Sequence, residues 1–189
     1  MSEEWVVNAS PLILFSRIDR LDLIEDVAPA ILVPNAVIEE VRAGQHKDRT
    51  AARAMEWAGG YRVEDIAVAA SIEHWDLGTG EAQVIAHCVD APRWAVLDDR
   101  AARRCAAAHD VRVIGTLGVV LRPKNRGQVE SARPLVKKLV AAGMLSAMSS
   151  WKPCLPASGN EALMPQAHVG LFRTSCGHLT FFLCSLCCL

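Results

Sequence analysis

The sequence predicts an α/β domain whose strands form a parallel sheet. Short apolar runs of strand length alternate with longer segments of helical periodicity along the chain. That alternation is typical of βαβ units, in which helices cover both faces of the sheet. Hydrophobic residues make up 51% of the 189 residues. This composition excludes a disordered chain, and the length is sufficient for one domain with a substantial core.

Each element of this α/β pattern is expected from a local signal. Five buried strands are predicted at residues 5–7, 30–33, 61–66, 94–97 and 111–114. Turn-forming residues 8–11 follow the first strand, and Pro34 stands where a first helical position tolerates proline. Helices are predicted at residues 12–18, 35–42, 49–57, 81–89, 100–109, 116–121 and 133–142.

The regular alternation stops near residue 148. We therefore expect a domain at residues 1–147 and an irregular, Cys-rich tail at residues 148–189, either disordered or derived from a frameshift. A zinc site built from Cys176, His178 and the last three cysteines is the alternative, but the ligand spacing lacks two separated pairs. Cys88 and Cys105 lie in apolar helical patterns and are expected to be reduced thiols of the core.

Charge is distributed unevenly although the net charge is only −1. Residues 1–92 hold seven Lys/Arg against sixteen Asp/Glu, whereas residues 93–138 hold eleven against four. An acidic region facing a basic one would suit an anion-binding cleft, and solvated helix faces are the alternative explanation. No secretory signal and no apolar segment of membrane-spanning length is visible, so we expect a cytoplasmic protein without membrane contact.

Polar residues follow several of the predicted strands. Asn8 and Ser10 come after the first strand, Asp98 and Asp99 after the fourth, and Thr116 after the fifth. In a parallel sheet, ligands bind at the carboxyl ends of strands near the point where the strand order reverses. These five residues are therefore candidates for a functional site.

Two glutamates on helices extend this candidate site. Helical periodicity places Glu40 beside a buried stripe and Glu39 on the solvent side. Glu81 shares a helix face with Ile85, Cys88 and Val89, which directs its carboxylate inward. Favourable placement at a helix N-terminus could explain Glu81 alone, but an inward carboxylate is costly unless it is paired or bound to metal.

The order of these motifs resembles a PIN-like branch of bacterial proteins, related to the toxin ribonucleases of VapBC-type toxin–antitoxin pairs. The resemblance covers about residues 5–147 and rests on short motifs around Asn8–Ile13, Val37–Val41, Gly80–Ala82, Val96–Arg100 and Gly115–Gly118. It implies a three-layer α/β/α sandwich with about five parallel strands. It also implies a metal-dependent ribonuclease, and hence a hydrolase.

The resemblance assigns roles to residues by position. Glu40, Glu81 and Asp99 match catalytic metal ligands, Asp98 is a substitute or helper, and Ser10 and Thr116 support the site. Asn8 stands at the first acidic position, where the wider family usually has Asp, so metal affinity is expected to be lower. Mg²⁺ or Mn²⁺ is the expected cofactor because both prefer oxygen ligands. The histidines lack metal-ligand spacing and are expected at surface or helix positions.

The basic stretch is the predicted contact for RNA phosphates. It contains Arg100, Arg103, Arg104, Arg122, Lys124 and Arg126. A solubilising surface is the alternative for Arg103 and Arg104. The resemblance further implies an RNA substrate, a cognate antitoxin protein that covers the acidic cleft, and a possible homodimer.

Two rival functions remain open from the sequence. The first is a catalytically weak or inactive PIN-like module that binds RNA or protein, which Asn8 and the unusual tail favour. The second is a doubly wound domain that binds a small molecule and is unrelated to nucleases. The second rival predicts that Glu40, Glu81 and Asp99 do not converge.

Overall fold

The computed structural model describes residues 3–46, 48–125 and 132–144. Its sheet has five strands, all parallel, in the order β3-β2-β1-β4-β5. The strands are β1 (Glu4–Val7), β2 (Ala30–Pro34), β3 (Arg62–Val63), β4 (Trp94–Val96) and β5 (Arg112–Ile114). The predicted parallel α/β fold is therefore confirmed.

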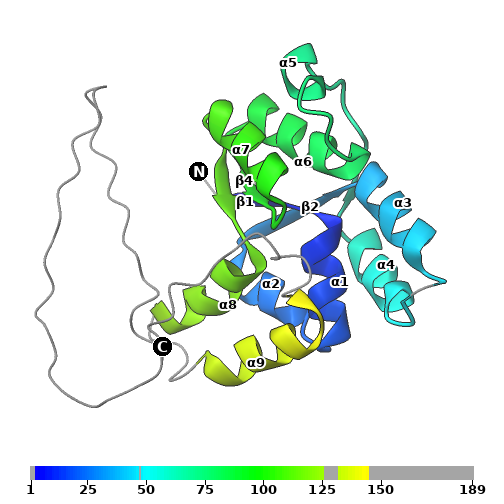
Figure 1. Ribbon diagram of the computed structural model, residues 1–189, viewed down its shortest axis with the longest axis vertical. Helices are drawn as coiled ribbons and strands as arrows, with labels where there is room; N and C mark the ends of the chain where they lie inside the picture. Colours follow the sequence, from blue (N-terminus) through cyan, green and yellow to red (C-terminus); the bar gives the residue numbers. More distant parts are fainter. Residues whose placement is uncertain (1–2, 47, 126–131, 145–189) are drawn as a thin grey trace, which may run out of the picture. The chain divides into compact units, whose positions relative to one another are not determined.

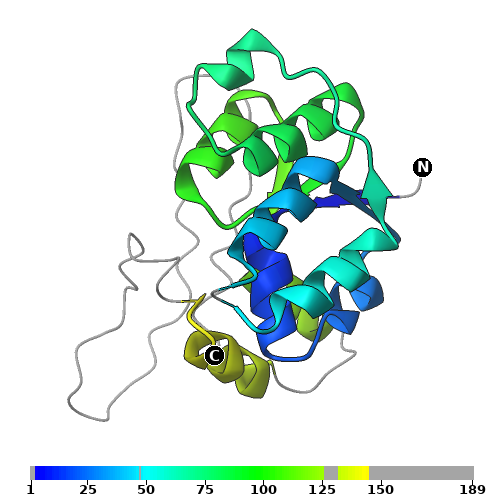
Figure 2. The same cartoon turned by 90° about the vertical axis from the view of Figure 1, so that its right-hand side faces the viewer.

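Helices cover both faces of this sheet (Figure 1). Along the described part of the chain they are α1 (Ala9–Arg17), α2 (Asp22–Val27), α3 (Asn35–Gly44), α4 (Ala51–Gly59), α5 (Ala70–Glu73), α6 (Thr79–Asp90), α7 (Arg100–Ala108), α8 (Thr116–Asn125) and α9 (Arg133–Ala141). α6 and α7 lie on one side of the sheet, and α1, α2 and α8 lie on the other (Figure 1). α3 contacts both α4 and α6, and the light-blue α3 lies between them in Figure 2. This is the α/β/α arrangement.

The middle of the sheet carries most of the core. Trp5, Val6 and Val7 of β1 are fully buried because helices pack on both faces of this central strand. The chain runs outward from β1 through β2 to β3, then returns to place β4 on the other side of β1. The strand order therefore reverses between β1 and β4, and a crevice is expected at their carboxyl ends. No helix within the described ranges is both long and apolar enough to cross a membrane.

Three local predictions differ from the structure. The third strand was expected at residues 61–66 but is only Arg62–Val63. The buried Gln83 amide explains the early end, because it binds the Ile66 N–H (2.9 Å) and the Ile66 carbonyl (2.8 Å), drawing that backbone towards α6. Pro34 completes β2 and is the N-cap of α3 instead of its first helical residue, while the helix begins at Asn35 as predicted. The short helices α2 and α5 were not predicted, because neither completes the two turns over which a helical period repeats.

His87 lies in a helix, as expected, and the structure buries it within α6. Its Nε2 lies 3.1 Å from the Glu64 carbonyl oxygen, which holds the segment after β3. Burial, and then the positive charge of Arg93, lowers the pKa of His87 below its ordinary value of 6.5. The folded protein therefore favours the neutral ring, whereas the unfolded chain takes up a proton more readily.

We expect this histidine to make stability depend on pH. The contribution of the neutral His87 ring to folding stability is complete above pH 6.5. It is lost as the pH falls from 6.5 towards the lowered pKa of the folded state. Urea unfolding of the wild-type chain and His87→Gln at pH 7.5 and 5.5 checks this. The wild-type chain should lose more unfolding free energy between the two pH values than the variant loses. Equal losses would exclude His87 as the source.

Candidate metal centre at the carboxyl ends of β1 and β4

Asn8 begins the site at the point where the strand order reverses. It follows β1 directly, and its backbone N–H donates to the Val96 carbonyl oxygen of β4 at 3.2 Å. The side chain is only 2% exposed, and its Oδ1 accepts no hydrogen bond within the described structure. A buried polar atom without a partner costs about 1–3 kcal/mol. An orphaned oxygen of this kind is suited to a cation that the protein binds.

Glu40 reaches this edge from α3 and is half-buried. Its Oε1 accepts a hydrogen bond from the Gly80 backbone N–H at 2.8 Å, at the beginning of α6. The positive end of a helix dipole favours a carboxylate in this position. A Cβ added at Gly80 would stand 2.5 Å from Glu40 Oε2, so only glycine leaves room for this approach. Sequence reasoning placed Gly80 in a motif but did not identify this role.

Glu81 is the third residue of α6 and lies beside the other acidic residues. Its pKa is raised, first by burial and then by the negative charges of Asp99 and Glu40. The Gly78 N–H donates a hydrogen bond to Glu81 Oε2 at 3.4 Å, and this hydrogen bond lowers the pKa of Glu81. Glu40 of α3 and Asp99 at the start of α7 therefore both lie within electrostatic reach of Glu81. This proximity disagrees with the rival that predicted no convergence.

The face assigned to Glu81 from periodicity is correct in part. Ile85 and Cys88 are buried as expected, but Val89 is 47% exposed. Val89 lies near the end of α6, where it lines a cavity together with Ile72 of α5.

The two adjacent aspartates have different local tasks. Asp99 is the N-cap of α7, where its Oδ1 accepts from the N–H groups of Ala101 (2.6 Å) and Ala102 (2.9 Å). Asp98 uses both oxygens on Thr116, accepting from its N–H at 2.8 Å and from its hydroxyl at 2.5 Å. Asp98 therefore anchors the start of α8, whereas Asp99 keeps Oδ2 without a hydrogen-bond partner among the described residues.

The donor set fits a hard divalent cation in its chemistry. The oxygens without strong hydrogen bonds are Asn8 Oδ1, Glu40 Oε2, Asp99 Oδ2 and the Glu81 carboxylate, and oxygen donors suit Mg²⁺ and Mn²⁺. A cation would also offset the repulsion that raises the Glu81 pKa. Within the described ranges, no three His, Cys, Asp or Glu side chains are already arranged as a metal-binding group. The fit therefore rests on the donor chemistry and on the amide oxygen of Asn8.

Comparison with known families agrees with this architecture. Residues 4–159 match the family described as a PIN domain. The chain belongs to the PIN-domain family. PIN domains are generally nucleases, and they typically use divalent metal ions. No curated protein matches the chain.

Among the predicted RNA contacts whose side chains are described, Arg103 places its guanidinium at the carboxyl edge of the PIN domain. Its Nη1 lies 3.4 Å from the position that a Cβ on Gly115 would take, and Asp98 Oδ1 lies 3.0 Å from the same position. Arg100 is exposed at the first position of α7. The Arg104 guanidinium lies over the Trp75 ring, 5.8 Å from its centroid.

Arg122 lies at the opposite edge of the PIN-domain sheet. It forms an ion pair with Glu3 at 2.8 Å, and its guanidinium lies over the rings of Trp5 and Trp94, near the beginnings of β1 and β4. This correction follows from helix length, because Arg122 is nearly two turns beyond the start of α8. Arg122 therefore joins α8 to the amino edge of the sheet and is not carried into the proposal below.

The remaining predicted residues fall in different parts of the chain. Thr116 is fully buried and binds Asp98, and Ser10 is partly exposed in the first turn of α1. The side chain of Lys124, the whole of Arg126 and the expected tail at residues 148–189, including its cysteines, lie outside the described residues. Cys88 and Cys105 are buried, and burial raises the pKa of both thiols.

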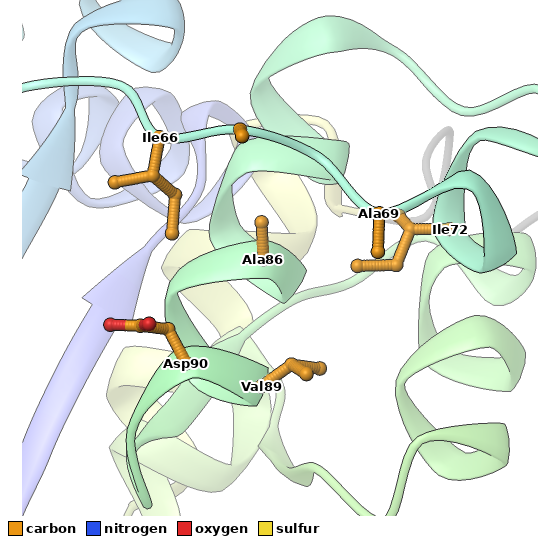
Figure 3. Close-up of a pocket in the computed structure, with 7 residues that line it drawn as sticks. Ile66, Ala69, Ile72, Ala86, Val89 and Asp90 are labelled. Carbon is orange, nitrogen blue, oxygen red and sulfur yellow. The ribbon is translucent and has the colours of Figure 1, made fainter.

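A small cavity of about 180 Å³ occurs elsewhere in the PIN domain. It lies between residues 66–72 and the second half of α6 (Figure 3). Glu81, and the Gly80 N–H that binds Glu40, are instead at the beginning of that helix. Its lining is mostly apolar, with Asp90 as the charged member. This cavity is separate from the candidate metal centre.

Proposed function

We propose that this PIN domain is a divalent-metal-dependent endoribonuclease and the toxin component of a toxin–antitoxin pair. One observation carries the nuclease proposal: Glu40 and Asp99 both lie within electrostatic reach of Glu81, and the orphaned Asn8 oxygen directly follows the strand at which the strand order reverses. Membership of the PIN-domain family supports the same chemistry. The toxin role rests on the sequence resemblance described above.

The proposed chemistry assigns a task to each side chain. Asn8, Glu40, Glu81 and Asp99 would hold Mg²⁺ or Mn²⁺, which when bound supplies a Lewis acid for the scissile phosphate and lowers the pKa of a water molecule. Gly80 holds Glu40 through its N–H, and the α7 N-terminus holds Asp99. Asp98 and Thr116 fix the neighbouring loop without contributing a free oxygen. Prepositioned ligands of this kind reduce the rearrangement needed when the metal binds.

RNA is the proposed substrate, and a protein antitoxin is the proposed partner. An antitoxin that covers the acidic edge would block both metal and RNA, and self-association through helices is a further expectation of the resemblance. Incubation of the purified chain with a mixed RNA pool in Mg²⁺, Mn²⁺ or EDTA tests the nuclease proposal. Cleavage that requires the metal would support it; intact RNA in every condition, without metal binding by calorimetry, would contradict it.

Asn8 gives a second, independent test of the metal centre. An amide oxygen adds no negative charge, so Asn8→Asp should bind Mn²⁺ at least about tenfold more tightly, because the ligand set gains one charge. Isothermal titration calorimetry measures this, and the cleavage rate at low Mn²⁺ should rise with it. The metal-free variant should melt at a lower temperature, since a further carboxylate would be buried beside the existing three. Unchanged Mn²⁺ affinity would place Asn8 outside the ligand set.

A non-catalytic module that binds RNA or protein is the alternative function. The amide at position 8 favours it, because the site then holds one charge fewer than a fully acidic set. This alternative predicts that RNA binds without cleavage in Mn²⁺ and that Asn8→Asp does not create cleavage. The two functions are therefore separated by the same purified proteins.

A further inference from the structure

Arg103 lies one helical turn after Asp99 on α7. Side chains four residues apart share a helix face and lean towards its N-terminus. The Arg103 guanidinium accordingly reaches back to the carboxyl edge, where its Nη1 is 3.4 Å from the position of a Cβ on Gly115. Asp98 Oδ1 is 3.0 Å from that same position. Gly115 thus leaves the space through which a guanidinium approaches the acidic edge.

This guanidinium has no acidic partner among the described residues. The ion pairs found there involve other arginines, namely Arg17, Arg20, Arg42, Arg53, Arg93 and Arg122. The nearby Asp98 carboxylate uses both oxygens on Thr116. Arg103 is also exposed, so its N–H donors remain accessible from solvent. An accessible, unpaired guanidinium near Asp98, one helical turn after Asp99, is suited to hold an anion that approaches this edge.

We propose that Arg103 binds a non-bridging oxygen of the RNA phosphate beside the carboxylates. This inference rests on the proposed ribonuclease function and names the residue that holds the substrate. Carboxylates repel a phosphate diester, and a positive charge near them reduces that repulsion. The planar guanidinium can donate two parallel hydrogen bonds to a phosphate, and such a contact carries no base preference.

Arg104 provides a matched comparison on the same helix. It is also exposed, but it is rotated by about 100° around the helix axis relative to Arg103. Its guanidinium consequently lies over the Trp75 ring rather than at the carboxyl edge. The proposal therefore leaves Arg104 outside the phosphate contact, although both residues have the same charge.

RNA binding by a non-cleaving protein tests the assignment. Glu81→Gln in EDTA would be titrated into a fluorescent single-stranded RNA, with and without Arg103→Ala, Arg103→Lys or Arg104→Ala, at several salt concentrations. We expect Arg103→Ala to weaken binding about five- to tenfold and to reduce the salt slope by about 0.7, the loss of one phosphate contact. Arg103→Lys should keep the salt slope, because the charge remains. It should bind RNA more weakly than the protein that retains Arg103, because an ammonium cannot donate the two parallel hydrogen bonds of a guanidinium.

The comparison with Arg104 decides the outcome. Arg104→Ala should change the affinity by less than about twofold, as expected for a charge away from the contact. Equal losses for the two alanine variants, an unchanged salt slope for Arg103→Ala, or absence of RNA binding by Glu81→Gln would each overturn the assignment. Failure of the ribonuclease proposal is recognised separately, because it is an absence of cleavage by the wild-type chain in Mg²⁺ and Mn²⁺.

Discussion

Replacement of Glu81 by Gln should abolish metal-dependent RNA cleavage, with a loss of at least about 100-fold in rate. The amide keeps the size of the side chain but removes the negative charge from the centre of the group formed with Glu40 and Asp99. The measurement is the initial rate of RNA cleavage in Mn²⁺, with the wild-type chain and the variant purified in parallel. Glu39→Gln is the matched control, since Glu39 is exposed on α3 and pairs with Arg42.

The same substitution should stabilise the metal-free protein. The raised pKa of Glu81 means that its ionised form is disfavoured in the folded state. The resulting loss of folding stability is absent below pH 4.5 and grows as the pH rises through the raised pKa of the folded state. At neutral pH the variant should therefore melt at a higher temperature, by about 2–4 °C for each kcal/mol relieved. Mn²⁺ should raise the melting temperature of the wild-type chain more than that of the variant.

The cleavage rate and the melting temperature together distinguish a metal ligand from a residue that is needed only for folding. A variant that is inactive because it is unfolded would melt at a lower temperature. A variant that is inactive yet more stable would have lost a functional charge. Full cleavage by Glu81→Gln would contradict the assigned metal centre, and a similar loss in Glu39→Gln would indicate a general charge effect.

Gly80→Ala should reduce metal-dependent cleavage by at least about tenfold while leaving the fold intact. The added methyl would stand 2.5 Å from Glu40 Oε2, so the carboxylate must move away from the α6 N-terminus. A displacement of about 1 Å at a catalytic group can cost about 100-fold in rate. Stability should change by less than about 1 kcal/mol, because the clash meets the end of a flexible side chain and alanine is the better helix former.

Gly44→Ala is the control for this substitution. Gly44 belongs to α3, as Glu40 does, but no atom lies within 4 Å of the position of an added Cβ. Cleavage rates in Mn²⁺ and thermal melts would be compared for both variants. The control should retain wild-type activity. Equal activity of the two variants would show that the contact between Gly80 and Glu40 does not set the position of the carboxylate.

The order of strands and helices could be predicted from the sequence because local patterns encode it. The apolar run at Trp5–Val7 is buried throughout, as expected for a central parallel strand. Periodicity also separated Glu39, which is exposed, from Glu40, which is half-buried. It failed where a distant side chain competes for the backbone, since Gln83 takes the hydrogen bonds of Ile66 that would have lengthened β3.

Tertiary structure decided how residues of the same type divide their tasks. Asp98 and Asp99 are adjacent, yet Asp98 binds Thr116 and Asp99 caps α7. Arg103 and Arg122 belong to the same basic stretch, yet they lie at opposite edges of the sheet. Periodicity indicates which side of a helix faces inward, but not which residues of other elements contact that side.

The sequence by itself determined the α/β alternation, the parallel sheet and the acidic residues from which a site could be built. Only the tertiary structure decided that Glu40 meets the start of α6, through a contact between residues 40 positions apart in the chain. The physical reason is that secondary structure follows from local patterns, whereas a functional site requires oxygens from separate elements to meet. That meeting depends on how the helices pack across the sheet.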